Sequence, residues 1–131
     1  MSAALGHRLR DGSFPPSVET RKVDVLIIGG GISGLSAAWR LAKAGVDDFL
    51  VLDMEGEVGG NSRAGQSPFV AYPWGAHYLP LPTREATLVR ELLAELGALH
   101  GDPAALRPTY EERYLCATPQ ERVYRNGLWE E

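Results

Sequence analysis

The sequence has little cysteine and no excess of basic residues, which excludes an internal disulfide and argues against a nucleic-acid surface. Its 131 residues include a single cysteine, Cys116, so an internal disulfide is excluded and the redox compartment stays open. Lysine and arginine total 13 against 17 acidic residues, and the basic residues are dispersed along the chain. A nucleic-acid surface requires a basic patch or stripe, so we expect no nucleic-acid partner.

Long apolar runs are missing as well. The longest uncharged stretch lies between Asp24 and Arg40 and is interrupted by glycines and serines, whereas a membrane helix needs ~20 predominantly apolar residues. The start of the chain has no hydrophobic region of the kind found in signal peptides. We therefore expect no transmembrane segment, with the cytoplasm as the default compartment and export left open in case an upstream segment is missing.

Residue patterns for metal binding or nucleophilic catalysis are not visible either. His7, His77, His100 and Cys116 have no spacing compatible with metal ligands, so no metal site is predicted. Residues 113–116 have strand character, which predicts a buried and unreactive Cys116. With 44% apolar residues, a chain of this length can form a core.

What the sequence does have is an ordered series of segments between Val23 and Gly60. The apolar run of residues 23–28 predicts a strand buried in a parallel sheet. Gly29, Gly31 and Gly34 follow in a G-x-G-x-x-G pattern. In a dinucleotide site the first glycine permits a tight turn, the second lets the backbone approach a pyrophosphate, and the third lets helix and strand pack closely.

A helix is predicted from Ile32 to Ala44, with Gly45 as its stop. Its first N–H groups, those of Ile32, Ser33 and Gly34, would point at the phosphates, where the helix dipole also favours negative charge.

Phe49 to Leu52 reads as a second strand, and Asp53 follows at its carboxyl end. A carboxylate about 20 residues beyond the glycines accepts hydrogen bonds from ribose hydroxyls and repels a 2′-phosphate. Strand, glycine loop, helix, strand and acid in this order predict an α/β fold built on a Rossmann-like FAD/NAD(P)-binding βαβ unit.

A second glycine pair, Gly59-Gly60, follows the acid and is unusual for nicotinamide dehydrogenases. Here the sequence resembles the flavin amine oxidase and phytoene desaturase-like group of FAD-dependent oxidoreductases. The resemblance covers roughly residues 23–81 and is carried by Gly29-Gly30-Gly31-Ile32-Ser33-Gly34, Ala38, Gly45, Asp53, Gly59-Gly60 and Trp74-Gly75-Ala76-His77-Tyr78. Asn61 stands where the group often has arginine, and Asp53 where glutamate is commoner.

The resemblance implies that the protein binds FAD and takes a hydride from a C–H bond of a small-molecule substrate. His77 is the residue we expect to face the flavin and is the one weak catalytic candidate; a histidine that pins its own loop is the alternative. The cofactor-binding residues that follow are Gly29, Gly31, Ile32, Ser33, Gly34, Asp53, Gly59, Gly60, Asn61, Ser62, Arg63, Gly75, Ala76 and His77.

The remaining segments frame this unit. Residues 1–22 mix prolines, glycine and charges and are expected to form an extended lead-in. Residues 83–97 predict an amphipathic helix with Thr83 as N-cap, Gly97 as its stop and an apolar face that includes Val89 and Leu96. Asp102-Pro103 predicts a capped turn. Asn126-Gly127 predicts the type I′ turn of a C-terminal β-hairpin.

Residues 23–131 provide only a partial sheet, so we interpret them as the N-terminal part of an FAD-binding domain whose remainder and substrate domain are absent. Such a chain would need that missing part or a partner chain. Two other classes stay open, a nicotinamide-binding Rossmann domain of a dehydrogenase and a non-catalytic nucleotide-binding or interaction fragment. The substrate, electron acceptor and oligomeric state are not readable from the sequence.

Overall fold

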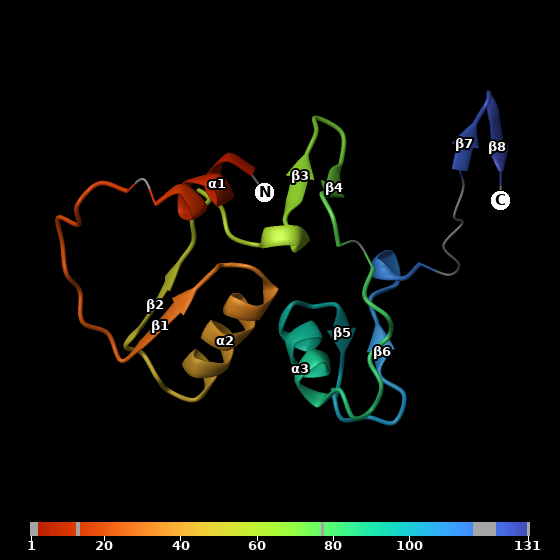
Figure 1. Ribbon diagram of the computed structural model, residues 1–131. Coiled ribbons are helices and arrows are strands. Elements are labelled where there is room, and N and C mark those ends of the chain that lie inside the picture. The colour runs from red at the N-terminus through yellow and green to blue at the C-terminus, as the bar shows by residue number, and fades with distance from the viewer. Residues whose placement is uncertain (1–2, 13, 77, 117–122, 131) are drawn as a thin grey trace. The chain divides into compact units, whose positions relative to one another are not determined.

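The computed structural model describes residues 3–12, 14–76, 78–116 and 123–130, which form two compact units, residues 1–78 and 79–131 (Figure 1). None of the helices among these residues is long and apolar enough to cross a membrane. The elements in chain order are α1 (Ala3–Asp11), β1 (Val25–Ile28), α2 (Ile32–Lys43), β2 (Phe49–Leu52), η1 (Gly60–Ser62), β3 (Ala64–Gln66), β4 (Ala71–Pro73), α3 (Thr87–Glu95), β5 (Leu99–His100), β6 (Thr109–Tyr110), η2 (Glu112–Tyr114), β7 (Val123–Arg125) and β8 (Leu128–Glu130).

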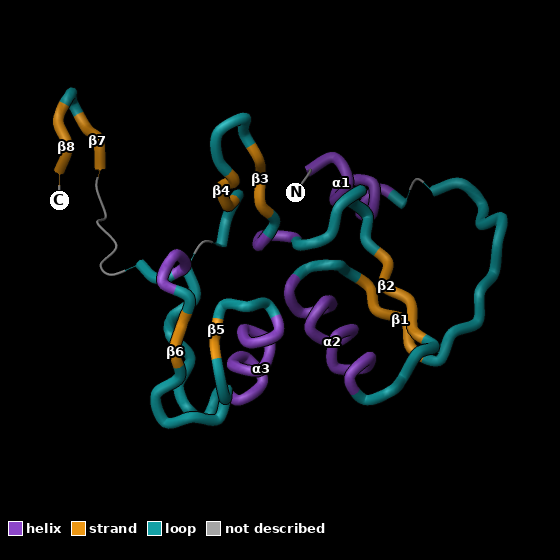
Figure 2. The backbone as a smooth tube through the Cα atoms, turned by 180° about the vertical axis from the view of Figure 1, so that it is seen from behind, coloured by secondary structure: helices purple, strands orange, loops and turns teal. Residues whose placement is uncertain are grey.

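The first unit is centred on β1, α2 and β2, which confirm the predicted βαβ unit. β1 and β2 pair in parallel, with Val25 opposite Phe49 and Ile28 opposite Leu52. The helix α2 lies along both strands (Figures 1 and 2). It ends where Gly45 takes a φ of 74°, a left-handed conformation that favours glycine.

The two faces of this small sheet differ in how they are covered. Val25 and Ile27 are half-buried on the face toward α2, while Leu26 and Ile28 on the opposite face are 51% and 83% exposed. Leu52, the partner of Ile28 in the register, is exposed as well. Parallel strands are normally covered on both faces, so the described residues supply cover for only one.

Beyond β2 the chain forms a hairpin that the sequence did not predict. β3 and β4 pair antiparallel, with Gly65 opposite Tyr72. The Ser67 hydroxyl closes the turn, because it donates to the Val70 carbonyl oxygen (2.9 Å) and accepts from the Val70 N–H (3.0 Å). The hairpin is therefore fixed by its own backbone and one serine side chain.

The second unit is built around α3 and the short β5–β6 pair, which lie side by side in Figure 2. Among the described residues, Leu99 is the one fully buried apolar side chain (2% exposed) and Arg90 the one buried charged side chain (5% exposed). The Arg90 guanidinium donates hydrogen bonds to the carbonyl oxygens of Pro82 (3.2 and 3.3 Å), Pro103 (3.4 Å) and Ala105 (3.0 Å). A buried arginine thus holds three loop carbonyls around the helix.

The predicted helix of residues 83–97 is confirmed in kind but begins later, at Thr87, with Ala86 as N-cap. Thr83 is not the cap, since its carbonyl oxygen accepts from the Ala86 N–H in a preceding turn. Val89 and Leu96, expected on the inward face, are 37% and 67% exposed, whereas Arg90 is 5% exposed. Gly97 ends the helix as predicted, with a φ of 72°.

Two further segments correct the sequence interpretation. Residues 3–11 form helix α1 where we expected an extended lead-in, since Ala3, Ala4 and Leu5 are good helix formers and arginines occupy the last turn. Residues 112–114 form the 3₁₀ turn η2 instead of a strand, and Cys116 is exposed instead of buried. The core expected from composition is correspondingly small within the described chain.

The turn predictions for the end of the chain are confirmed. The Asp102 side chain accepts from the Ala104 N–H (2.8 Å), which caps the turn that follows it. β7 and β8 pair antiparallel through Asn126 (φ 53°) and Gly127 (φ 83°), the two left-handed residues of a type I′ turn.

Candidate functional site

The three glycines of the motif, two in the loop after β1 and one in the first turn of α2, have different surroundings. Gly29 has a φ of 103°, which only glycine adopts readily. A Cβ on Gly34 would lie 1.9 Å from the Gly29 carbonyl oxygen, so helix and loop could not approach so closely with any side chain there. A Cβ on Gly31 would meet nothing within 4 Å. Backbone conformation therefore explains Gly29 and close packing explains Gly34, whereas neither applies to Gly31, in front of which the space is open.

The helix α2 begins directly at this open space. Gly31 is its N-cap and makes no side-chain cap hydrogen bond, and the first turn carries no acidic residue. The backbone N–H groups of Ile32, Ser33 and Gly34 belong to that first turn, where N–H groups have no partner within the helix. A helix start without a carboxylate of its own attracts an external anion.

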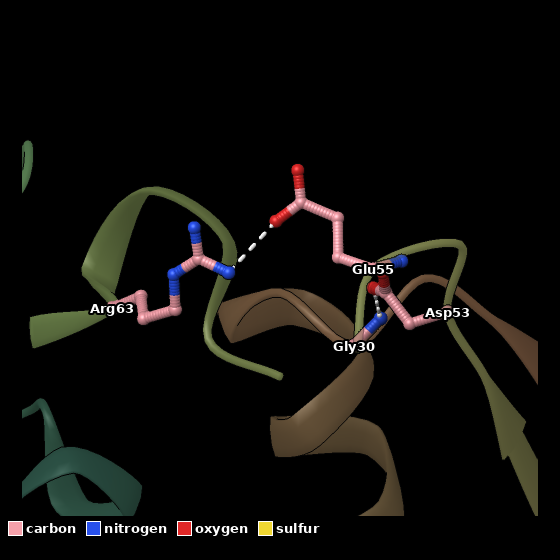
Figure 3. A network of polar contacts seen from close by, with 4 residues as sticks. All are labelled: Gly30, Asp53, Glu55 and Arg63. Atoms are coloured by element: carbon pink, nitrogen blue, oxygen red, sulfur yellow. Dashed lines mark hydrogen bonds and ion pairs between the residues drawn. The ribbon is translucent and has the colours of Figure 1, made fainter. Parts of the chain in front are cut away.

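Asp53 lies at the carboxyl end of β2 and is tied to the glycine loop. Its Oδ2 accepts a hydrogen bond from the Gly30 N–H (2.6 Å), and its Oδ1 accepts from the Glu55 N–H (2.8 Å) (Figure 3). The backbone N–H groups of Glu55 and then Gly30 hold the pKa of the Asp53 carboxyl below its ordinary 3.8. The side chain is thus an ionised acceptor at neutral pH, held in place by backbone donors.

The glycine pair after Asp53 packs against the same loop. Gly59 and Gly60 have φ values of 117° and 53°, and the Gly59 N–H donates to the Gly30 carbonyl oxygen (2.7 Å). A Cβ on Gly60 would come within 3.2 Å of the Gly31 Cα. The structure therefore brings the two glycine motifs predicted from the sequence into one place, backbone against backbone.

The predicted segments 61–63 and 74–76 also come together. The Ala76 N–H donates to the Asn61 carbonyl oxygen (2.9 Å), and the Trp74 N–H donates to the Arg63 carbonyl oxygen (3.1 Å). Gly75 is needed at this contact, because a Cβ there would lie 2.9 Å from the Asn61 carbonyl oxygen. Together with Gly60, these segments border a polar pocket of about 380 Å³ lined by Gly60, Asn61, Arg63, Trp74 and Gly75.

Arg63 reaches away from this backbone contact toward Glu55. Its Nη1 lies 3.0 Å from Glu55 Oε2, and the two side chains are 25% and 17% exposed (Figure 3). The charge of Arg63 lowers the pKa of Asp53 only as a minor contribution. The site therefore contains two carboxylates and one guanidinium near the start of α2.

One predicted site residue is not described by the structure, and two residues of the site were not predicted. His77, the weak catalytic candidate, lies outside the described residues. In the described part of the chain, no group of three or more histidine, cysteine or acidic side chains could hold a metal ion. Gly30 and Glu55 were missed as site residues, although their position beside Gly29 and Asp53 in the motif was a usable signal.

The sequence pattern of the family described as NAD(P)-binding Rossmann-like domain matches residues 27–96. That range contains the glycine loop, α2, Asp53, the second glycine pair and the segment around Trp74. The matched residues are more than half of the chain.

Several curated relatives are similar to part of the chain. Amine oxidase [flavin-containing] A of Canis lupus familiaris is 44% identical over 78 residues, which are 58% of this chain and 15% of the relative. Polyamine oxidase 7 of Oryza sativa subsp. japonica is 38% identical over 60 residues, 46% of this chain and 13% of the relative. Baeyer-Villiger monooxygenase ATR8 of Stachybotrys chlorohalonatus is 40% identical over 120 residues, 92% of this chain and 18% of the relative. The chain spans less than a fifth of the length of these relatives.

Proposed function

Because the chain belongs to the NAD(P)-binding Rossmann-like domain family, we propose that it is the N-terminal FAD-binding portion of a flavin-dependent oxidoreductase. The cofactor proposal is supported by the relatives, one of which is named as flavin-containing and all of which are named as oxidases or monooxygenases. When bound, FAD supplies the acceptor for a hydride from a substrate C–H bond. The residues of this chain bind and orient it.

One observation carries the proposal, the open space in front of Gly31. Packing demands a glycine at position 34, whereas a Cβ on Gly31 would meet no heavy atom within 4 Å. A ligand that needs close backbone approach explains a glycine there, and the helix start behind it carries no acid of its own. A pyrophosphate has the charge and size for such a place.

Each part of the ADP half then has a proposed contact in the chain. The N–H groups of Ile32, Ser33 and Gly34 would bind the pyrophosphate, with Gly29 and Gly31 shaping the loop around it. Asp53 would accept hydrogen bonds from the adenosine ribose hydroxyls with its remaining lone pairs. Because Asp53 already accepts from the Gly30 N–H, its carboxylate is oriented before any ligand arrives.

The second glycine pair and the two segments beside it would hold the next part of the cofactor. We propose that Gly59 and Gly60 bring the backbone close to the pyrophosphate and ribityl chain. Segments 61–63 and 74–76 would border the ribityl chain and the flavin. This set consists of Asn61, Ser62, Arg63, Gly75 and Ala76, and His77 remains a proposed flavin neighbour and weak catalytic candidate.

Catalysis of the whole reaction is assigned to a longer protein of which this chain is a part. The chain spans 13% to 18% of the three relatives' lengths, and Leu26, Ile28 and Leu52 on one face of its parallel sheet are exposed. We propose that the rest of the enzyme, or a partner chain, covers that face and brings the substrate pocket. The substrate is a small molecule with an oxidisable C–H bond.

The test is to purify the chain with and without added FAD and to record its visible spectrum after removal of free cofactor. We expect a yellow protein with the two absorption bands of bound flavin, and we expect ADP to displace the flavin competitively. Tight binding of NADH together with no retention of FAD would overturn the cofactor assignment and favour a nicotinamide-dependent dehydrogenase.

A matched pair of variants separates the site from the fold. Gly31→Ala adds a methyl group to open space, so it should leave the thermal unfolding of the chain nearly unchanged while it abolishes flavin retention. Arg21→Gln changes an exposed ion pair with Glu19 and should affect neither property. Equal flavin retention by wild type and Gly31→Ala would contradict the proposed position of the pyrophosphate.

A further inference from the structure

The ion pair between Glu55 and Arg63 is more buried than the surface pairs Arg21–Glu19 and Arg125–Glu130. Its side chains are 17% and 25% exposed, whereas Arg21–Glu19 and Arg125–Glu130 have side chains at least 50% exposed. Exposed ion pairs contribute little because solvent and salt screen them. A half-buried pair with an Nη1–Oε2 distance of 3.0 Å is screened less and defines the position of both side chains.

The pair also closes a circuit of contacts through the glycine loop, of which Figure 3 shows the part formed by Gly30, Asp53, Glu55 and Arg63. Gly30 donates its N–H to Asp53, and the Glu55 N–H donates to the same carboxylate. The Glu55 side chain reaches Arg63, whose N–H donates to the Gly60 carbonyl oxygen (3.2 Å). Gly59 then returns to the Gly30 carbonyl oxygen through its own N–H (2.7 Å). Through Gly30 and Glu55, the circuit connects Asp53 with the Gly59–Gly60 backbone, which are both proposed to face the cofactor.

We propose that Glu55 and Arg63 act as an ion-pair clasp, which sets the affinity of the glycine-loop site for the ADP part of a dinucleotide without contacting it. The inference rests on the proposed function and changes the role of Arg63 within it. Arg63 is a positioning residue, because its guanidinium is engaged by Glu55 instead of being turned to a phosphate. The clasp holds the loop of residues 53–63 so that Asp53 and the Gly59–Gly60 backbone face the same ligand.

The two possible roles of Arg63 predict opposite effects of Glu55→Gln on ligand affinity. If Arg63 contacted a phosphate directly, removal of the Glu55 charge would release the guanidinium and strengthen the binding of an anionic ligand. If the pair is a clasp, Glu55→Gln and Arg63→Gln break the same circuit and weaken binding alike. The direction of the Glu55→Gln effect therefore separates the two roles.

The experiment measures the dissociation constant of ADP by titration calorimetry for the full 131-residue chain and its variants. All measurements are made at a temperature where circular dichroism reports each variant as folded. We expect Glu55→Gln and Arg63→Gln each to raise the dissociation constant about tenfold, the effect of about 1.4 kcal/mol of lost binding free energy. The exchanged pair Glu55→Arg with Arg63→Glu should recover most of the affinity, and Arg63→Lys part of it. The control Arg21→Gln should bind as wild type does.

A second measurement covers the case in which the glutamine variants fail to fold. Hydrogen exchange of the Gly30 and Gly59 amides is then compared between wild type and Arg63→Lys, which keeps the positive charge. The clasp predicts faster exchange of both amides in Arg63→Lys and slower exchange when ADP is added to either protein.

The outcomes distinguish this inference from the function on which it rests. Wild-type chain that binds neither ADP nor FAD overturns the proposed function and the clasp together. Wild-type chain that binds ADP while Glu55→Gln binds equally or more tightly overturns the clasp alone. Unchanged exchange of the Gly30 and Gly59 amides in Arg63→Lys also overturns it.

Discussion

The two units of this chain are organised by opposite means. In residues 1–78 the site is made of backbone, because glycines let loop, helix and glycine pair approach closely and one aspartate ties them together. In residues 79–131 the centre is a side chain, the buried guanidinium of Arg90, to which three loop carbonyls turn. A site made of backbone at fixed glycine spacings can therefore be predicted from a sequence motif. A centre made by one side chain and distant carbonyl oxygens is found only once the fold is known.

The two units also differ in where their hydrogen-bonding groups are directed. Arg90 has its hydrogen-bonding capacity directed inward, so its contacts organise the loops of the second unit. We propose that the N–H groups at the start of α2 and the carboxylate of Asp53 are instead directed at a ligand. Substitutions in the first unit should therefore separate binding from stability, and those at Arg90 should not.

The largest effect is expected for Gly34→Ala. Its Cβ would lie 1.9 Å from the Gly29 carbonyl oxygen, so loop and helix must move apart. We expect a loss of at least about 3 kcal/mol in the free energy of unfolding, measured by urea titration. Gly31→Ala is the matched control and should cost less than about 1 kcal/mol. Similar losses for both variants would contradict the division between a packing glycine and a ligand glycine.

Arg90→Met should have the next largest effect, confined to the second unit. The substitution keeps an apolar side chain of similar length and leaves the carbonyl oxygens of Pro82, Pro103 and Ala105 without their donor. We expect a loss of about 2 to 3 kcal/mol, read from hydrogen exchange of the α3 amides. ADP binding should be unchanged at a temperature where the variant is folded. A variant as stable as wild type would show that Arg90 is not the centre of this unit.

Gly127→Ala should have a smaller and purely local effect. Gly127 has a φ of 83° in the turn between β7 and β8, where an alanine is strained. The expected cost is about 1 kcal/mol in the stability of the hairpin. The near-ultraviolet circular dichroism of the Tyr124–Trp129 pair, whose ring centroids are 5.1 Å apart, would report it. Loss of flavin retention in this variant would contradict the prediction that its effect is confined to the hairpin.

The smallest effect is a dependence of stability on acid pH that comes from Asp53. The pKa of Asp53 is held below its ordinary 3.8 in the folded chain by the N–H groups of Glu55 and Gly30. The carboxylate therefore contributes stability above about pH 4, and the contribution is lost as the pH falls through 3.8 toward the lower folded value. Melting temperatures of wild type and Asp53→Asn should converge as the pH is lowered through this range. Parallel curves from pH 6 to pH 3 would contradict the assignment.

The βαβ unit was predictable because its signals are local. A β-branched run, glycines at fixed spacing and Asp53 after the second strand each follow from backbone geometry that a short stretch of sequence specifies. The turn at Asn126-Gly127 was predictable for the same reason. Even the meeting of residues 61–63 with residues 74–76 follows the family resemblance, in which both segments approach the cofactor.

What the sequence could not show depends on contacts between distant residues. The sequence analysis assigned no role to Arg90, and only the fold brings carbonyls from residues 82, 103 and 105 to its guanidinium. The start of α3 was misplaced because Thr83 is a good N-cap residue that serves a preceding turn instead. The position of Glu55 shortly after Asp53 was a usable signal for the site, but its ion pair with Arg63, eight residues away, was not visible in the sequence.

The measurement that tests the central claim most directly is titration calorimetry of ADP into wild-type chain and into Gly31→Ala under identical conditions. We predict saturable binding of one ADP to the wild type and no measurable binding to Gly31→Ala, with superimposable far-ultraviolet circular dichroism for the two proteins. Equal binding of ADP by both proteins would contradict the claim that the open space in front of Gly31 receives the pyrophosphate.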